Sequence, residues 1–173
     1  MEKNIFTIRK SFLLPLGLVV LLTLFLLVSC ILLQLPLAKI LILGTFILPA
    51  VIIFAESSRR RIFIGETDIQ FDKLFRSKLL NYQDLTSIDT VLVRKRAFVS
   101  LSTEEDFVIL SNSFDHFDTL LQQLLARVPA SVISEETRQL ASNPPKNSRD
   151  VFSAWVAVAV LALIIFVQLR GAF

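Results

Sequence analysis

Two clusters of three consecutive basic residues are the strongest candidates for a binding site in this sequence. The 59–61 cluster is Arg59, Arg60 and Arg61, and the 94–96 cluster is Arg94, Lys95 and Arg96. Each basic residue near an anionic bilayer contributes about 1 kcal/mol to the binding of lipid head groups. The 94–96 cluster, expected at a hairpin tip, also suits an acidic partner. The simpler alternatives are a membrane-interface anchor for the first cluster and a solvated turn for the second.

The other reactive side chains predict no catalytic or metal site. His116, the one histidine, lies beside Asp115 and Asp118, but helix capping and the helix dipole explain these residues more simply. The acidic run 104–106 lacks the ligand spacing of an EF-hand, and Cys30, the one cysteine, stands in an apolar run. There is no nucleophile elbow, phosphate-binding glycine loop, zinc spacing or dinucleotide fingerprint. We therefore expect no enzyme, no cofactor and no metal.

Three long apolar runs indicate that the chain crosses a membrane. They cover residues 11–38, 40–55 and 151–169. A helix needs roughly 20 mostly apolar residues to cross a bilayer. The first and third runs are long enough to cross a bilayer. The second run is also long enough if residues 35–38 are included and the Lys39 side chain extends to the interface. We expect a transmembrane hairpin over residues 11–56 and a third transmembrane helix over residues 151–169.

Basic residues around these runs predict the topology, because Lys and Arg collect on the cytoplasmic side of membrane proteins. The tail of residues 1–10 carries Lys3, Arg9 and Lys10, and the second run ends at the 59–61 cluster. We therefore expect a cytoplasmic tail at residues 1–10, a cytoplasmic middle domain, and an outside tail at residues 170–173. The expected location is the inner or plasma membrane of the cell. No Asp, Glu, His or Arg lies deep in a run, which argues against an ion pump.

The polar block between the second and third runs has a β pattern followed by an α pattern. Six or seven short segments from Ile62 to Leu110 alternate with a period of two, as in an antiparallel meander. Ser113 is a suitable N-cap for an amphipathic helix that ends near Pro129. We expect the helix stripe over residues 117–125 to pack on a core formed by Ile62, Ile69, Phe71, Val91, Val99 and Ile109. Residues 131–150 are expected to form a linker, with a weak helix over residues 131–141.

Several short segments in this block resemble bacterial membrane proteins with a pleckstrin-homology-like (PH-like) domain. They are Tyr82-Gln83-Asp84-Leu85 with Ser87-Ile88, Glu105-Asp106-Phe107-Val108-Ile109-Leu110, and Ser113-Phe114-Asp115. A helical hairpin before the domain is also typical of that family, whereas a third transmembrane helix after it is a departure. The resemblance covers roughly residues 60–128. It implies an α+β PH-like domain at residues 57–130, a partly open antiparallel barrel with one C-terminal helix, and carries no functional signature.

These observations favour a non-catalytic membrane-embedded scaffold or accessory subunit whose cytoplasmic PH-like domain docks a partner protein. The alternatives are an anionic-lipid-binding membrane domain and a subunit of a larger transport or enzyme complex. The expected partners are membrane lipids and a protein or larger membrane complex. We expect no nucleic-acid partner, because the net charge is only +3 and no basic stripe is interleaved with aromatic residues.

Overall fold

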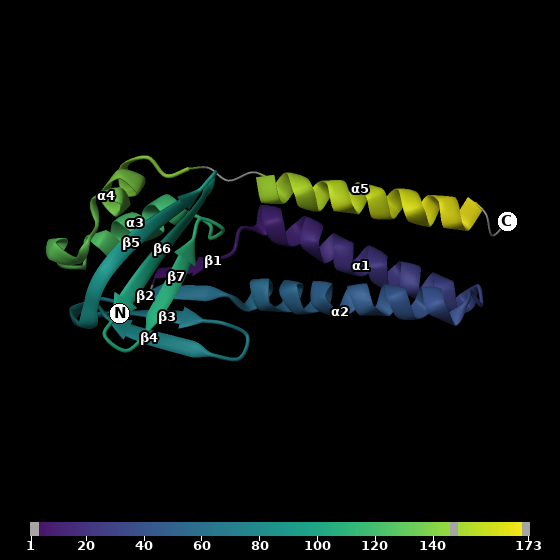
Figure 1. The fold of residues 1–173 in the computed structure, drawn as a ribbon, viewed down its shortest axis with the longest axis horizontal. Coiled ribbons are helices and arrows are strands. Elements are labelled where there is room, and N and C mark those ends of the chain that lie inside the picture. The colour runs from purple at the N-terminus through teal and green to yellow at the C-terminus, as the bar shows by residue number, and fades with distance from the viewer. Residues whose placement is uncertain (1–3, 146–148, 171–173) are drawn as a thin grey trace. The chain divides into compact units, whose positions relative to one another are not determined.

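The computed structural model describes residues 4–145 and 149–170. These residues form two compact units (Figure 1). One unit, the β domain, contains residues 4–9 and 59–145, and the other, the helical unit, contains residues 10–58 and 149–170. The three long helices and two antiparallel sheets agree with the predicted combination of a helical membrane part and a β-rich domain.

The helical unit consists of α1 (Lys10–Leu32), α2 (Leu37–Arg59) and α5 (Arg149–Arg170). All three are long and apolar enough to cross a membrane, which confirms three candidate spans and indicates a membrane protein. Helices α1 and α5 pack against each other. Gln168 Nε2 of α5 donates a hydrogen bond to the buried Cys30 Sγ of α1 over 3.7 Å, so Cys30 has a packing role. Gly17 lets α1 approach the Phe54 ring of α2 closely, because an added Cβ would lie 3.1 Å from that ring.

Seven strands in two antiparallel sheets make up most of the β domain. The four-stranded sheet contains, in spatial order, β1 (Asn4–Thr7), β2 (Arg61–Ile64), β3 (Asp68–Asp72) and β4 (Ser77–Asn81). The three-stranded sheet contains β5 (Leu85–Val93), β6 (Arg96–Thr103) and β7 (Phe107–Ser111). A 3-10 turn, η1 (Tyr82–Asp84), connects the sheets. Burial raises the pKa of its Tyr82 to about 12, and the Tyr82 hydroxyl donates to the Gly65 carbonyl over 3.2 Å.

The core follows the period-two pattern, with two exceptions to the expected list. Ile62, Ile69, Phe71 and Val99 are buried as expected. Val91 and Ile109, however, are 58% and 54% exposed. In β7 the inward positions are taken by Val108 and Leu110, and neighbouring residues of a strand point to opposite faces. The prediction that Val91 and Ile109 belong to the core was therefore wrong.

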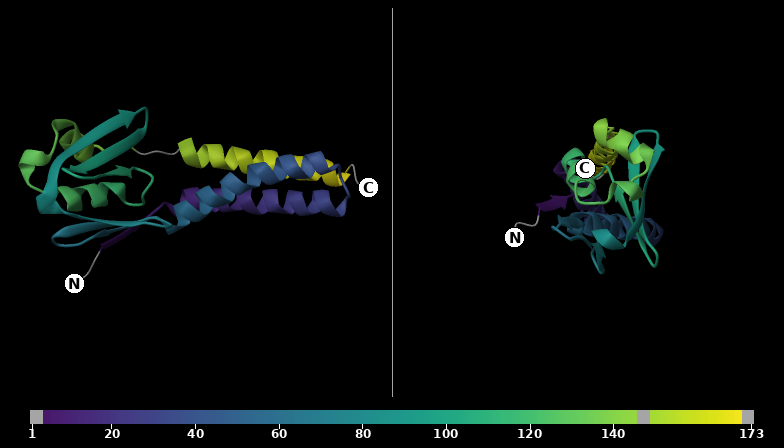
Figure 2. Two further views of the ribbon diagram at one scale, coloured as in Figure 1. Left: turned by 60° about the horizontal axis from the view of Figure 1, so that its bottom comes forward. Right: turned by 90° about the vertical axis from the view of Figure 1, so that its left-hand side faces the viewer.

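Helix α3 (Phe117–Leu125) supplies the predicted apolar stripe, but it begins later than expected. Its buried residues are Phe117, Leu120, Leu121 and Leu124, and Figure 2 shows α3, in green, alongside the two sheets. Ser113 is not its N-cap. The Ser113 carbonyl accepts from the Arg9 amide and the Asp115 amide donates to the Thr7 carbonyl, so this segment pairs with the N-terminal strand. The helix starts only after His116, whose φ of 48° lies in the left-handed region.

Residues 4–9 belong to the β domain. The sequence analysis had predicted a tail over residues 1–10, and for residues 4–9 that prediction was wrong. Strand β1 pairs with β2, and Ile8 forms a bridge with Phe114. Phe6 and Ile8 are buried, whereas Ile5, on the opposite face, is 56% exposed. The α1–α2 hairpin is therefore inserted between two paired strands, β1 and β2. If both helices cross the membrane, the two strands must lie on the same side of it.

We expect Ile8→Ala to lower the free energy of unfolding of the domain by about 2–5 kcal/mol, because it leaves a cavity in a packed site. Ile5→Ala removes the same atoms from an exposed site and should change stability by less than about 0.5 kcal/mol. Thermal unfolding of the full chain in lipid nanodiscs compares the two variants. Equal melting temperatures would contradict the placement of β1 in the sheet.

The expected linker over residues 131–150 is likewise mostly part of the domain. It contains the 3-10 turn η2 (Ala130–Val132) and α4 (Glu135–Ser142), which agrees with the weak helix expected there. The fully buried Thr137 donates from Oγ1 to the Ile88 carbonyl of β5 over 3.2 Å. The Ser134 amide donates to the same carbonyl over 3.0 Å. The domain therefore extends beyond residue 130, while residues 146–148 of the expected linker lie outside the described residues.

Candidate functional site: a basic cleft beside strand β7

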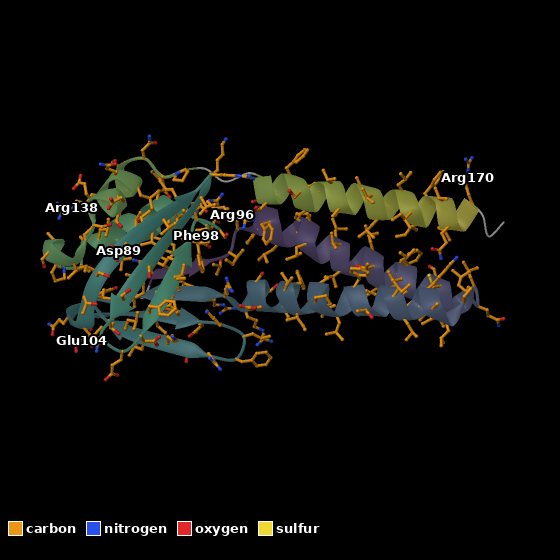
Figure 3. All side chains as sticks on the ribbon, in the orientation of Figure 1. Asp89, Arg96, Phe98, Glu104, Arg138 and Arg170 are labelled. Carbon is orange, nitrogen blue, oxygen red and sulfur yellow. The ribbon has the colours of Figure 1, made fainter. Side chains whose placement is uncertain are left out.

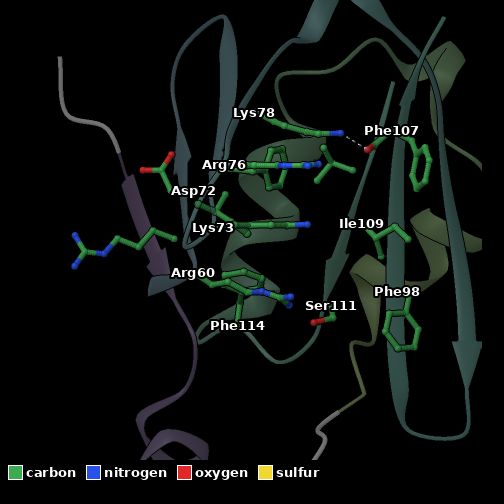
Figure 4. Close-up of a pocket in the computed structure, with 14 residues that line it drawn as sticks. Arg60, Asp72, Lys73, Arg76, Lys78, Phe98, Phe107, Ile109, Ser111 and Phe114 are labelled. Carbon is green, nitrogen blue, oxygen red and sulfur yellow. Dashed lines mark hydrogen bonds between the residues drawn. The ribbon is translucent and has the colours of Figure 1, made fainter. Parts of the chain in front are cut away.

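A cleft of about 370 Å³ lies within the β domain, between the end of the four-stranded sheet and strand β7 (Figure 4). We call it the β7 cleft. One wall comes from β2, β3, β4 and the β3–β4 turn, and the other from β6 and β7. The volume falls in the lower part of the range typical of ligand sites. The cleft is therefore large enough for a small group or for a few side chains of a peptide.

The first wall of the β7 cleft is strongly basic. Arg60, Lys73, Arg76 and Lys78 supply four cations to it. Arg61 and Asp72 also border the cleft, but they lie on the opposite strand face from the buried Ile62 and Phe71, and the Asp72 carboxylate points away from β7 (Figure 4). Strand register explains the grouping, because Arg61 lies opposite Asp72 and Asp72 opposite Ser77 at one end of the sheet. The side chains of Arg60, Lys73, Arg76 and Lys78 extend toward β7 (Figure 4). Clustered charges of one sign in a cleft attract an anionic group of a ligand or partner.

One of these cations also joins the two sheets. Lys78 Nζ lies 2.6 Å from Asp106 Oδ1, and 3.5 Å from the Phe107 carbonyl at the start of β7. The hydrogen bond from Lys78, followed by that from the Phe107 amide, lowers the pKa of Asp106. Asp106 thus stabilises one end of the cleft and offsets the charge of Lys78. Lys73 and Arg76 are exposed and are the cations best placed to meet an incoming acidic group.

The second wall combines apolar side chains with a free strand edge. β7 is the last strand of its sheet and pairs only with β6 in the described residues. Phe107 and Ile109 are 60% and 54% exposed, and Phe98 and Phe114 also line the cleft. An unpaired edge carries backbone donors and acceptors that can pair with another extended chain. This wall can therefore accept a strand and contact apolar side chains of that strand.

The two predicted basic clusters differ in their relation to the β7 cleft. Arg60 and Arg61 line the β7 cleft, whereas Arg59 ends helix α2 and is not among the lining residues. Arg94 and Lys95 form the turn between β5 and β6, Arg96 begins β6, and all three are exposed. None of them lines the cleft.

The sequence analysis did not predict that Lys73, Arg76 and Lys78 lie close to Arg60 and Arg61. In the sequence, Arg76 and Lys78 indicate only a third, weaker basic hairpin tip. The missed signal is alternation, because Lys78 shares the inward face of the hairpin with buried Leu80, and it lies opposite buried Phe71. A basic residue on an otherwise apolar strand face indicates an opening at that end of the core.

The His116 region has the geometry of an exposed turn. His116 Nε2 lies 3.9 Å from Asp115 Oδ2, and the Asp115 carboxylate also accepts from the His116 amide. Among the residues described, no group of three His, Cys, Asp or Glu side chains could hold a metal ion. In the acidic run 104–106, Asp106 is the residue with a defined role, as the partner of Lys78.

Comparison of the chain with protein-family models, curated proteins and solved structures found no match. The resemblance to PH-like domains therefore rests on the sequence segments named above. The function is inferred below from the geometry of the β domain.

Proposed function

We propose that this chain is a non-catalytic membrane-embedded scaffold or accessory subunit whose β domain is a PH-like module that docks a partner protein. Support for the PH-like assignment comes from seven antiparallel strands in sheets of four and three, followed directly by an amphipathic helix. In this proposal the α1–α2 hairpin occupies the connection between the first two strands. The basic flanks of the helices favour a cytoplasmic β domain in a cell membrane.

The observation that carries the proposal is the pairing of a basic wall with a free strand edge in the β7 cleft. An acidic, extended segment of a partner could add a strand beside β7 through main-chain hydrogen bonds. Its carboxylates would face Lys73 and Arg76, and its apolar side chains would cover Phe107 and Ile109. Strand addition of this kind supplies affinity through the backbone and specificity through alternate side chains.

Anionic lipid is the second candidate ligand for the cleft. It is favoured by Arg60 and Arg61, which directly follow helix α2 in the chain. A lipid phosphate would be satisfied by the basic wall alone. It would leave the exposed side chains of Phe107 and Ile109 without a role, and for this reason we favour a peptide.

Filling the cleft without changing its charge tests the proposal. Ser111 lines the cleft and faces the basic wall (Figure 4). We expect Ser111→Trp to remove the protein that co-purifies stoichiometrically with the full chain from native membranes in mild detergent. Gln122→Trp, at an exposed position of α3, is the matched control and should retain it. A Ser111→Trp chain that keeps the same protein at the same stoichiometry would refute docking at the cleft.

A further inference from the structure

Three connections between the β domain and the membrane helices leave the domain at one end. α1 follows Arg9 directly, α2 ends at Arg59, and α5 begins four residues after Pro145. Strand register places Thr7 opposite Arg61, so the first two connections are adjacent. Asn112 links the first and third, because its carbonyl accepts from Arg9 Nη2 over 2.6 Å and its Nδ2 donates to the Pro145 carbonyl over 3.0 Å.

The turn between β3 and β4 projects from this same end. Asp72 and Ser77, which bracket it, lie at the end of the sheet where Arg61 lies. The turn has the sequence Lys73-Leu74-Phe75-Arg76, and it is closed by a hydrogen bond from the Lys73 amide to the Arg76 carbonyl over 2.8 Å. Phe75 is 89% exposed. A well-formed turn thus presents an aromatic ring between two cations.

The β5–β6 tip lies at this end too. Asn112 Nδ2 donates to the Lys95 carbonyl over 3.0 Å, and thereby holds the tip beside Arg9 and Pro145. Val91, Leu92 and Val93 are 58%, 56% and 53% exposed, so both faces of this ribbon are apolar and uncovered. The exposed basic residues of the 94–96 cluster complete the tip. The two tips therefore share one composition, exposed apolar side chains next to basic residues.

We propose that these two tips, 73–76 and 91–96, form a bilayer-docking surface that inserts Phe75 and Leu92 into the interface of an anionic membrane. Exposed apolar groups gain free energy at a membrane interface, and neighbouring cations gain from anionic head groups. Because the three connections to the helices leave the domain at the same end as both tips, this end is the one we propose for docking. The proposal rests on the membrane-spanning helices. Lys73 and Arg76 belong both to the 73–76 tip and to the wall of the β7 cleft, so the 91–96 tip is the part that is independent of partner docking at that cleft.

Single tryptophan residues at the tips test this surface in the full chain. Trp155 is first replaced by Phe, and then Phe75→Trp or Leu92→Trp introduces one reporter. Glu104→Trp is the control, because Glu104 lies in the turn at the opposite end of β6 from Arg96 (Figure 3). The purified chains are placed in nanodiscs of brominated phosphatidylcholine with phosphatidylglycerol. Thermal unfolding first verifies that each variant is folded.

We expect blue-shifted emission and bromine quenching for Phe75→Trp and Leu92→Trp, and neither effect for Glu104→Trp. Arg94, Lys95 and Arg96 are then replaced by Ser in the Leu92→Trp chain. Each lost cation should lower the ratio of membrane-docked to undocked 91–96 tips about fivefold, so the bromine quenching of the tryptophan should be lost. Higher salt should also reduce the quenching, since it screens the attraction between the basic residues and the anionic lipids. The proposal is overturned if either tip reporter is quenched no more than Glu104→Trp. The absence of quenching is also expected if the tips bind an acidic protein and not the bilayer, because the purified chain has no such protein bound to it.

Discussion

Leu121→Asp should unfold the β domain while leaving the membrane helices inserted. Leu121 is fully buried in α3, among Leu120, Leu124 and the sheet core. The substitution removes apolar packing and buries a carboxylate without a partner, at a cost of more than about 4 kcal/mol. Small domains have about 5–15 kcal/mol of stability in total. Hydrogen exchange of the full chain in nanodiscs measures the effect as lost protection of the strand amides.

Gln122→Asp is the matched control for this change. Gln122 is the next residue of α3 and is exposed, so its carboxylate remains solvated. The control should shift stability by no more than about 0.5 kcal/mol. Native protection of the strands in Leu121→Asp would mean that α3 does not cover this core.

Reversing two charges in the β7 cleft should abolish binding of an acidic peptide. In Lys73→Glu with Arg76→Glu, like charges would face one another across the interface, which costs several kcal/mol. The affinity should therefore fall by about a hundredfold or more. The measurement is fluorescence anisotropy of a labelled Glu-rich peptide, titrated with the full chain in nanodiscs of neutral lipid.

A second pair of arginines provides the control for net charge. Arg127 and Arg138 are exposed and do not line the cleft, and reversing both makes the same change in total charge. Charges separated by more than about 8–10 Å are largely screened at physiological salt. The Arg127→Glu, Arg138→Glu chain should thus bind nearly as well as the parent. Equal weakening by the two double variants would show that the peptide responds to net charge and not to the cleft.

The membrane helices and the central strands could be predicted because each has a local signal. Apolar runs of spanning length predict α1, α2 and α5, and period-two alternation predicts most of the strands. The apolar stripe of α3 could also be predicted, since its buried residues recur at helical spacing. They are Phe117, Leu120, Leu121 and Leu124.

The features that were missed depend on contacts between distant parts of the chain. Phe6 and Ile8 alternate with Ile5 and Thr7 like a strand, but the partner of that strand lies beyond a whole helical hairpin. Pairing of residues 113–115 with β1 also delayed the start of α3, which no local capping signal predicts. α4 is short and polar, and its inclusion in the domain follows from the burial of its own residues Thr137 and Leu140.

The candidate site was only partly predictable for the same reason. The 59–61 and 94–96 clusters are visible as runs of basic residues. The β7 cleft is instead assembled from basic residues at the start of β2, in the β3–β4 turn and on β4, opposite a strand from the other sheet. Local charge runs do not indicate which cations converge. Strand register does, because it brings the β3–β4 turn and the start of β2 to one end of the sheet.

The most direct test of partner docking is a photo-activated cross-linking residue at Ser111, incorporated in the full chain and activated in native membranes. Mass spectrometry then identifies what is attached. The account predicts a protein segment that carries several Asp or Glu residues beside the attachment point, and no such product from the Lys73→Glu, Arg76→Glu chain. Attachment to lipid alone, or to a protein segment without acidic residues, would contradict it.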